Sequence, residues 1–297
     1  MSAAKSNKWH GLPPPDSFKN FVKDIPHYKN EYWHSIFDQA IFIELAKDLQ
    51  KGSSIVTDMD YTVYYEDAGF GLLEACHQLK MFSKKTSKRY KKLFKNYEDL
   101  PSIRSLEQKK IDEKNFYKET LKCFSGLKIE TLKKLSEKLW FEGFSKFHKK
   151  PLLHFIYPEM AYLFGICHQS IKSSQHGIVA VSSSPDFSLE PLLNILPIPR
   201  NHLCAVQFKE KNKALTSEIS LFIHGEDKVQ QSEKILPHWD YAFGDNPSND
   251  LPFLLCAKKG SFGIGKAMKN FNKTFKNHSK KMKAFYFLPF QKPPMAC

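Results

Sequence analysis

Short runs of β-branched and apolar residues alternate with longer stretches of helical periodicity along this chain. Such runs predict buried strands at residues 55–57, 178–181, 203–208 and 219–223, and a last core strand at 239–243. Helical patterns lie at 30–50, at 187–196 and in a short segment that ends at Ile235. Strands that alternate with helices and end in polar residues are typical of an α/β protein, whose parallel sheet binds ligands along its carboxyl edge.

The first two predicted strands are separated by about a hundred residues that contain no convincing β-rich run. Helix formers dominate there, glycines are few, and apolar residues recur at helical spacing. Such an insertion is too long for a loop and large enough for a small core of its own. We expect an extension over 1–51 with a Pro-rich segment and an amphipathic helix, a Rossmann-like core over 52–67 and 176–290, an all-helical cap over 68–175, and a tail over 291–297.

The composition is that of a globular chain, with 297 residues of which 41% are hydrophobic. No segment has the length and apolar character of a membrane span, so we expect a soluble, cytoplasmic protein. The six cysteines lie far apart without a CxxC pair, which favours reduced thiols. The 12 histidines show no HxH or HExxH pattern, so a zinc site is not expected.

The formal net charge of +14 comes mainly from lysine, with dense runs at 84–92 and 266–283. An excess of this size makes nucleic acid, an anionic membrane surface and phosphorylated substrates candidate partners. Most such runs are solvated helix faces. Because the chain carries no zinc-finger or RRM signature, nucleic acid is the least favoured of these partners.

Two acids one residue apart, Asp58 and Asp60, follow the first predicted strand. Side chains alternate along a strand, so both carboxylates point to the same side, where α/β proteins bind ligands. Close like charges need a cation between them, a proton on one of them, or both. A pair of acids at this spacing most often lies in a solvated turn without a function. Whether these two acids form a site therefore depends on the residues at the other strand ends.

The other predicted strand ends carry a hydroxyl at Ser182 and further acids at Asp245 and Asp250, with Lys228 upstream. An oxygen-only ligand set on separate strands suits Mg²⁺, which commonly binds a substrate phosphate as well. Lysine and serine add hydrogen-bond donors for phosphate oxygens. The pattern therefore indicates a phosphoryl-transfer site.

Four segments in this order resemble the motifs of the haloacid dehalogenase superfamily: DMDYT at 58–62, Val181-Ser182, Lys228, and GDNPSND at 244–250. The wording SSSPDF at 182–187, GEDK at 225–228 and YAFGD at 241–245 is similar to the phosphoserine phosphatase-like branch, which also carries a helical cap between its first two motifs. The resemblance covers about residues 53–270. It implies a phosphatase with a Rossmann-like core.

The resemblance also implies roles for individual residues. Asp58 would attack phosphorus and form an aspartyl-phosphate, while Asp60 would first protonate the leaving oxygen and then activate water. The Asp58 carboxylate, the backbone carbonyl of Asp60 and Asp245 would hold Mg²⁺. Ser182 and Lys228 would bind the phosphoryl oxygens.

Three further positions match less closely. Asp250 is expected to be a metal ligand or to support the metal ligands, Asn249 to contact phosphate, and Asp67 to face the cap and the substrate. Tyr61 stands where the family commonly has a small residue. The segment 260–266 fits a GxxxxGK phosphate loop, but Ala267 replaces the Ser or Thr that should reach Mg²⁺, so we interpret it as a turn.

The sequence thus predicts a Mg²⁺-dependent phosphatase, with a small phosphorylated metabolite, such as a phosphoamino acid, as the favoured substrate. A phosphoprotein or a phospholipid headgroup, met at an anionic surface, is the alternative. A basic nucleic-acid- or membrane-binding protein on a non-catalytic version of the fold is the alternative of another class.

Overall fold

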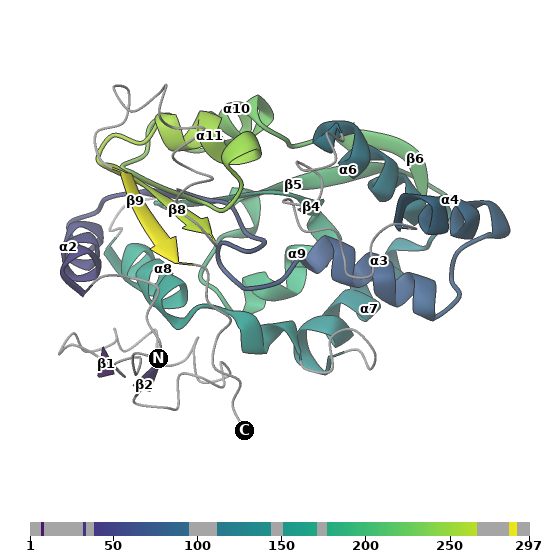
Figure 1. Cartoon of the computed structure of the whole chain (residues 1–297), viewed down its shortest axis with the longest axis horizontal. Helices are drawn as coiled ribbons and strands as arrows, with labels where there is room; N and C mark the ends of the chain where they lie inside the picture. The colour runs from purple at the N-terminus through teal and green to yellow at the C-terminus, as the bar shows by residue number, and fades with distance from the viewer. Residues whose placement is uncertain are drawn as a thin grey trace.

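A β-sheet of seven strands runs through the middle of the molecule (Figure 1). The computed structural model describes residues 7–8, 32–33, 39–94, 112–143, 151–170, 177–265 and 285–289. Within these residues the strand order is β6-β5-β4-β3-β7-β8-β9. The strands are β3 (Ile55–Thr57), β4 (Ile178–Pro185), β5 (Leu203–Lys211), β6 (Ala214–Leu221), β7 (Tyr241–Gly244), β8 (Gly260–Gly265) and β9 (Phe285–Pro289).

The central strand, β3, pairs in parallel with β4 on one side and β7 on the other. The remaining neighbours in the sheet are also parallel, except for β5 and β6, which form an antiparallel hairpin. Asn212 and Lys213 turn this hairpin with φ angles of 54° and 62°. Two-residue hairpin turns favour such left-handed conformations, because their twist matches that of the strands.

Alternate residues of the central strands point into two separate hydrophobic cores. Ile55 and Phe243 pack into one core, and their neighbours Val56 and Ala242 pack into the other. Helices α2 (Gln39–Gln50) and α8 (Pro158–Ser170) cover the first face, and α10 (Glu226–Glu233) and α11 (Pro247–Leu255) cover the second (Figure 1). Burial on both faces explains why the central strands are continuous apolar runs.

Between β3 and β4 the described residues form helices and turns, with only isolated bridges of β type. The helices are α3 (Ala68–Gln78), α4 (Lys84–Phe94), α6 (Glu113–Leu121), α7 (Ile129–Phe141) and α8, with short 3₁₀ turns at Lys122–Phe124 and Leu152–Phe155. Figure 1 shows α3, α4 and α6 gathered at one end of the molecule, away from α2. Helix α8 falls within the range expected for the cap, but it packs against α2 and β4 in the core.

Helix α7 is fastened to the segment that follows β4. The Trp140 Nε1 and Ser136 Oγ atoms both donate hydrogen bonds to the Ser188 carbonyl oxygen, at 2.7 and 3.1 Å. Ser188 lies on α9 (Asp186–Leu189), which continues as a 3₁₀ turn at Glu190–Asn194. The prediction of one continuous helix over 187–196 is therefore wrong, because the α-helix ends at Leu189 and a 3₁₀ turn follows it. Pro191 interrupts the α-helical hydrogen bonding there.

Two predictions near the end of the chain are wrong. The segment predicted as a turn at 260–266 contains β8, and the run at 239–243 is not the last core strand, because β8 and β9 follow it in the sheet. Gly260 suits this strand because an added Cβ would lie 3.3 Å from the Tyr286 ring and 3.5 Å from the Tyr241 ring. A phosphate loop is excluded for 260–265, since these residues are paired strand.

Other boundaries shift by several residues. The helix predicted from residue 30 begins at Gln39, because Tyr32–Trp33 form a short strand, β2, paired with β1 (Asn7–Lys8). The strand predicted at 219–223 is the end of β6, and the short helix α10 ends at Glu233. The lysine-rich run at 266–283 lies outside the described residues.

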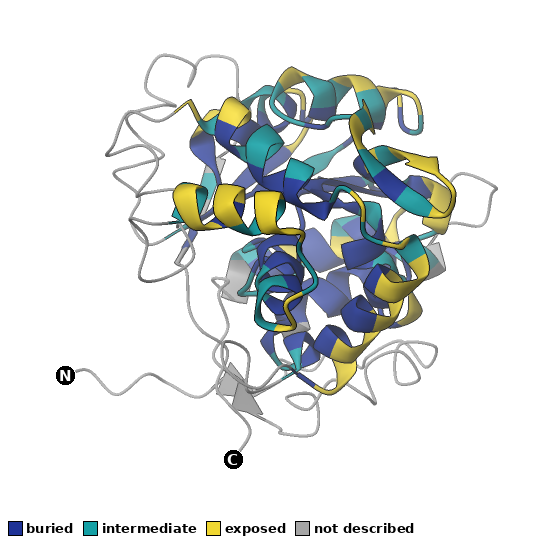
Figure 2. Cartoon of the chain, turned by 90° about the vertical axis from the view of Figure 1, so that its right-hand side faces the viewer, coloured by how far each residue is buried: buried dark blue, intermediate teal, exposed yellow. Residues whose placement is uncertain are grey.

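Burial follows these layers: strands β3, β4, β7 and β8 are largely buried, whereas β6 and the second half of β5 are partly exposed. Exposed residues line the outer faces of the helices (Figure 2). Among the described helices, none combines the length and the apolar character needed to cross a bilayer.

Candidate active site

The carboxyl ends of β3 and β7 meet because the two strands are adjacent in the sheet. The Asp58 amide donates to the Phe243 carbonyl oxygen at 2.8 Å, so the residue after β3 is tied to the end of β7. Asp245 directly follows β7, and Asp250 lies on α11, one helical turn into the element that begins at Pro247. The sheet thus brings together acids that lie nearly two hundred positions apart in the sequence.

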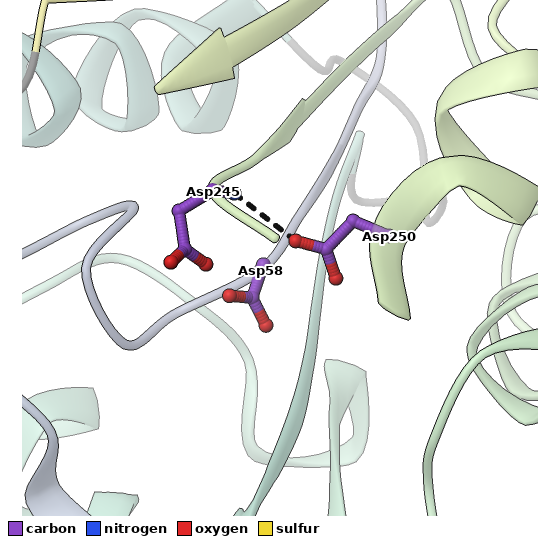
Figure 3. A group of neighbouring side chains, drawn as sticks. All are labelled: Asp58, Asp245 and Asp250. Carbon is purple, nitrogen blue, oxygen red and sulfur yellow. Dashed lines mark hydrogen bonds between the residues drawn. The ribbon is translucent and has the colours of Figure 1, made fainter. Parts of the chain in front are cut away.

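Asp58, Asp245 and Asp250 form a compact acidic group (Figure 3). One carboxylate oxygen from each lies within 4.8 Å of the others. The Asp250 Oδ2 atom accepts hydrogen bonds from the Asp245 and Asn246 backbone amides, at 3.0 and 2.9 Å. Gly244 permits this approach, because a Cβ there would lie 2.6 Å from the same oxygen.

Lys228, on α10, is the cation that faces this group from inside the protein. Its Nζ atom lies 2.6 Å from Asp58 Oδ1 and 2.6 Å from Asp250 Oδ1. The side chain is completely buried. Burial disfavours a charged lysine, but the two carboxylates outweigh it and raise the pKa of Lys228 above its ordinary value. Lys228 is therefore a fixed positive charge in this site.

The acids carry more negative charge than one lysine balances. Burial, together with the charges of Asp250 and Asp60, raises the pKa of Asp58 to about 7, although Lys228 opposes the shift. Burial and the neighbouring Asp58 and Asp250 charges also raise the pKa of Asp245 well above its ordinary value. Buried carboxylates of this kind need either protons or another cation.

A hard divalent cation such as Mg²⁺ suits these residues, because they offer carboxylate oxygens close together on rigid elements. Asp58 and Asp245 also line a cavity, so a ligand in it can reach their carboxylates. The Asp58 Oδ2 atom also accepts from Thr62 Oγ1, at 3.4 Å. Asp250 already accepts hydrogen bonds on both oxygens and is absent from the cavity wall. Its geometry suits the support of the other two acids and of Lys228.

Asp60 lines the same cavity but is not part of this acidic group, and its carboxylate is surrounded by hydrogen-bond donors. Its Oδ1 atom accepts from the Tyr64 hydroxyl and, at 2.8 Å, from the Ala68 amide. Its Oδ2 atom accepts from Ser182 Oγ and Ser184 Oγ, each at 2.9 Å. Ser182 therefore contacts Asp60 in this structure, and it is fully buried behind the cavity wall.

The cavity beside Asp58 is a small, partly open depression, and the figure of about 320 Å³ for its empty volume includes space open to solvent. Its lining includes four carboxylates and no lysine, arginine or histidine among the described residues. The residues are Asp58, Asp60, Tyr61, Asp67, Tyr117, Ser183, Ser184, Asp245, Asn246 and Asn249. A second cavity shares Asp67, Tyr117, Ser183 and Ser184 with it and is otherwise lined mainly by apolar side chains of α3 and of residues 120–124.

Two of the three positions that match the family motifs less closely, Asp67 and Asn249, line the cavity. Asp67 caps the start of α3 by accepting from the Phe70 amide at 2.7 Å, and burial, followed by the charge of Asp60, raises its pKa well above the ordinary value. Asn249 accepts from the Gly225 amide at 2.6 Å and donates to Ser183 Oγ at 3.3 Å. It therefore ties the loop before Lys228 to the end of β4.

Several residues of the site carry no signal in the sequence. Tyr117 reaches the cavity from α6, and Glu113 on the same helix accepts hydrogen bonds from Asn246 Nδ2 at 2.5 Å and Ser248 Oγ at 2.8 Å. These contacts join an inserted helix to the loop after β7 and to the first turn of α11. Ser184 is different, since its spacing of two from Ser182 in a strand predicts the shared direction.

No protein-family profile and no curated protein sequence matches this chain. Solved structures match it in fold. A protein of unknown function from Bordetella pertussis Tohama I is 12% identical, with a TM-score of 0.56, over 78% of this chain and 97% of that chain. A conserved protein of unknown function from Anaerococcus prevotii is 13% identical, with a TM-score of 0.56, over 86% and 96% of the two chains. Cytosolic 5′-nucleotidase IIIB, solved with cytidine, is 12% identical, with a TM-score of 0.50, over 85% and 86%.

Proposed function

The chain has the haloacid dehalogenase fold, as its ordered motifs predicted, and from this premise we propose that it is a Mg²⁺-dependent phosphatase acting on a phosphomonoester. One observation carries the proposal. Asp58 lies at the cavity wall, is hydrogen-bonded to a buried lysine, and shares a possible cation position with Asp245. A nucleophile, a metal site and a fixed positive charge thus coincide at one strand end.

In the proposed reaction, an Asp58 carboxylate oxygen attacks phosphorus and the bond from phosphorus to the leaving oxygen breaks. Asp60 gives the leaving oxygen a proton. In the second step Asp60 takes a proton from water, the water oxygen attacks the aspartyl-phosphate, and Asp58 is regenerated with release of phosphate. A carboxylate nucleophile divides one difficult displacement into two easier ones.

The Mg²⁺ ion, held by Asp58, Asp245 and the backbone carbonyl of Asp60, would neutralise charge on the phosphoryl oxygens. Lys228 would keep the Asp58 carboxylate oriented, and Asp250 would keep Lys228 in place. Ser183 and Asn249, which line the cavity, are candidates to donate hydrogen bonds to phosphate along with Ser182. Reduced cysteines and a cytoplasmic location complete the proposal.

The cavity lining also bears on the leaving group. Its described residues include acids, hydroxyls and aromatic rings but no basic side chain. A second anionic group on the substrate would therefore meet repulsion rather than a partner. We propose a small phosphomonoester whose leaving alcohol is uncharged or cationic, which disfavours phosphoamino acids with their carboxylate.

The direct test is hydrolysis of p-nitrophenyl phosphate with Mg²⁺, compared with the same protein in EDTA and with Asp58→Asn. We expect activity only for the unaltered protein with the metal. We also expect this protein to carry phosphate on an aspartyl group, in an acyl-phosphate bond that hydroxylamine cleaves. Equal rates for the protein and for Asp58→Asn would refute the mechanism. No hydrolysis of any phosphomonoester would favour the alternative class, a basic binding protein on the same fold.

One feature favours the second candidate, a phosphatase that meets its substrate at an anionic membrane surface. Helix α4 carries six cations and no acid, and its lysines at 84, 88 and 92 recur every four residues on one exposed face. Leu79, just before this helix, is 51% exposed. Basic helices next to exposed apolar residues suit anionic lipid. The protein should sediment with phosphatidylserine vesicles, and it should no longer do so when Lys84, Lys88 and Lys92 are changed to glutamate. The control, in which Lys133, Lys134 and Lys138 are changed to glutamate, should still sediment with the vesicles.

A further inference from the structure

We propose that Tyr64 and Ser184 are positioning residues, which hold the Asp60 carboxylate in place for the two proton transfers. The inference rests on the proposed function, because it assigns a task to neighbours of its acid and base. Tyr64 lies outside the segments that carry the family resemblance, and Ser184 lies in one of them, at 182–187, without a role that the resemblance implies. Both act through Asp60.

The hydrogen bonds around Asp60 leave it little freedom. Each carboxylate oxygen accepts two hydrogen bonds, and three of the four donors are hydroxyl groups. The fourth is the Ala68 amide, at the start of α3. A carboxylate rotates about its terminal torsion unless such partners fix it. A displacement of about 1 Å can cost a catalytic group roughly a hundredfold in rate, so these donors matter for the reaction.

Tyr64 is itself held rigidly. Its side chain is completely buried, and its ring packs edge-on against Trp140 of α7, with the ring centres 5.0 Å apart. Trp140 is fastened in turn by its hydrogen bond to the Ser188 carbonyl oxygen. The Tyr64 hydroxyl is therefore presented to Asp60 by a chain of contacts that runs through an inserted helix to the core. This chain gives α7 a role in placing the acid.

Ser184 is positioned by a close approach to α3. An added Cβ at Gly69 would lie only 2.6 Å from Ser184 Oγ, so glycine is required for the serine to sit where it does. The Ser184 amide also donates to Ser182 Oγ at 2.9 Å, which aligns the two hydroxyls that contact Asp60. Ser184 lines the cavity while Ser182 does not. It is the hydroxyl at the boundary between Asp60 and the substrate space.

The test compares leaving groups, because only a poor leaving group needs a proton from Asp60 in the first step. For Tyr64→Phe and Ser184→Ala we expect kcat/KM on a simple alkyl phosphate to fall roughly tenfold or more, within the range that general acids supply. The same variants should change kcat/KM on p-nitrophenyl phosphate by less than about twofold, since nitrophenolate leaves without a proton. Gly69→Ala should reproduce the effect of Ser184→Ala.

Matched controls are present in the chain. Tyr90→Phe removes another buried tyrosine hydroxyl that donates to a carboxylate, that of Glu74, and Ser188→Ala removes a buried serine hydroxyl bonded to the Pro185 carbonyl oxygen. Both controls should leave the ratio of the two kcat/KM values unchanged.

Equal losses on both substrates, or no loss on either, would overturn the inference. If Tyr64→Phe fails to fold in a thermal unfolding scan, Ser184→Ala decides alone. The proposed function fails separately, since in that case the unaltered protein would hydrolyse neither substrate faster than Asp58→Asn does.

Discussion

Lys228→Met should lower the free energy of unfolding far more than the loss of a surface ion pair does. Methionine has a similar volume, so the main change is the loss of a buried charge with two carboxylate partners at 2.6 Å. Removal of one partner from a buried charge pair commonly costs about 3–5 kcal/mol, because the other charge stays buried and unpaired. We expect a loss of this size in the free energy of unfolding at pH 8 without metal.

Lys259→Met is the matched control. The Lys259 Nζ atom also faces two carboxylates, at 2.9 Å from Asp48 and 3.9 Å from Asp240, but its side chain is 44% exposed. Surface pairs of this kind contribute about 0–1 kcal/mol. Urea denaturation of both variants and of the unaltered protein gives the three free energies directly.

The pH dependence separates electrostatics from packing. Asp58 has a pKa of about 7 in the folded protein, against 3.8 for an unperturbed aspartate, so the folded state binds more protons between these limits. Stability of the metal-free protein should therefore fall as pH rises from about 4 to 7. Without Lys228 the Asp58 carboxyl is harder still to ionise, so it is protonated at pH 5 and no unpaired charge is buried. The difference in free energy of unfolding between Lys228→Met and Lys259→Met should therefore shrink from pH 8 to pH 5. A difference that stays constant from pH 8 to pH 5, or equal losses for both lysines, would refute the reasoning.

Three further outcomes follow from the site. Mg²⁺ affinity, measured by isothermal titration calorimetry, should increase from pH 6 to pH 8 as Asp58 loses its proton, and an unchanged affinity would contradict a site at this carboxylate. Gly244→Ala should abolish Mg²⁺ binding and destabilise the protein by about 1–3 kcal/mol in urea denaturation, because its Cβ would displace Asp250; normal binding would show that the contact is dispensable. Glu113→Gln should speed proteolysis of the inserted helices and raise KM, since it weakens hydrogen bonds to the loop after β7, and identical cleavage rates would argue against such a link.

The central strands were predictable because burial on both faces makes them short, β-branched and apolar, as Ile55–Thr57 shows. Strand β8 was not predictable for the opposite reason. Its glycines are typical of a turn, and only the rings of Tyr241 and Tyr286, brought together by sheet pairing, explain Gly260. The edge hairpin of β5 and β6 runs antiparallel, which strand patterns alone do not reveal.

The acids of the site were predictable because their spacing after strands fixes their direction. Asp58 and Asp245 were expected to meet, and the sheet brings them together. Glu113 and Tyr117 could not be found in this way, because their contacts connect α6 to loops more than a hundred positions later in the sequence. The direction of Ser182 toward Asp60 depends on tertiary packing that no local pattern records.

The central position of β3 in the sheet has a consequence for folding during synthesis on the ribosome. Ser54, at the entrance of β3, is bonded to Asp240, which lies 186 residues later. At a translation speed of about 5–20 residues per second, the nascent strand waits roughly 10–40 s for that neighbour. During this interval the edge of β3 that pairs with β7 leaves its backbone N–H and C=O groups without their native partners, so we expect the growing chain to depend on chaperones that shield β-strands until β7 has emerged.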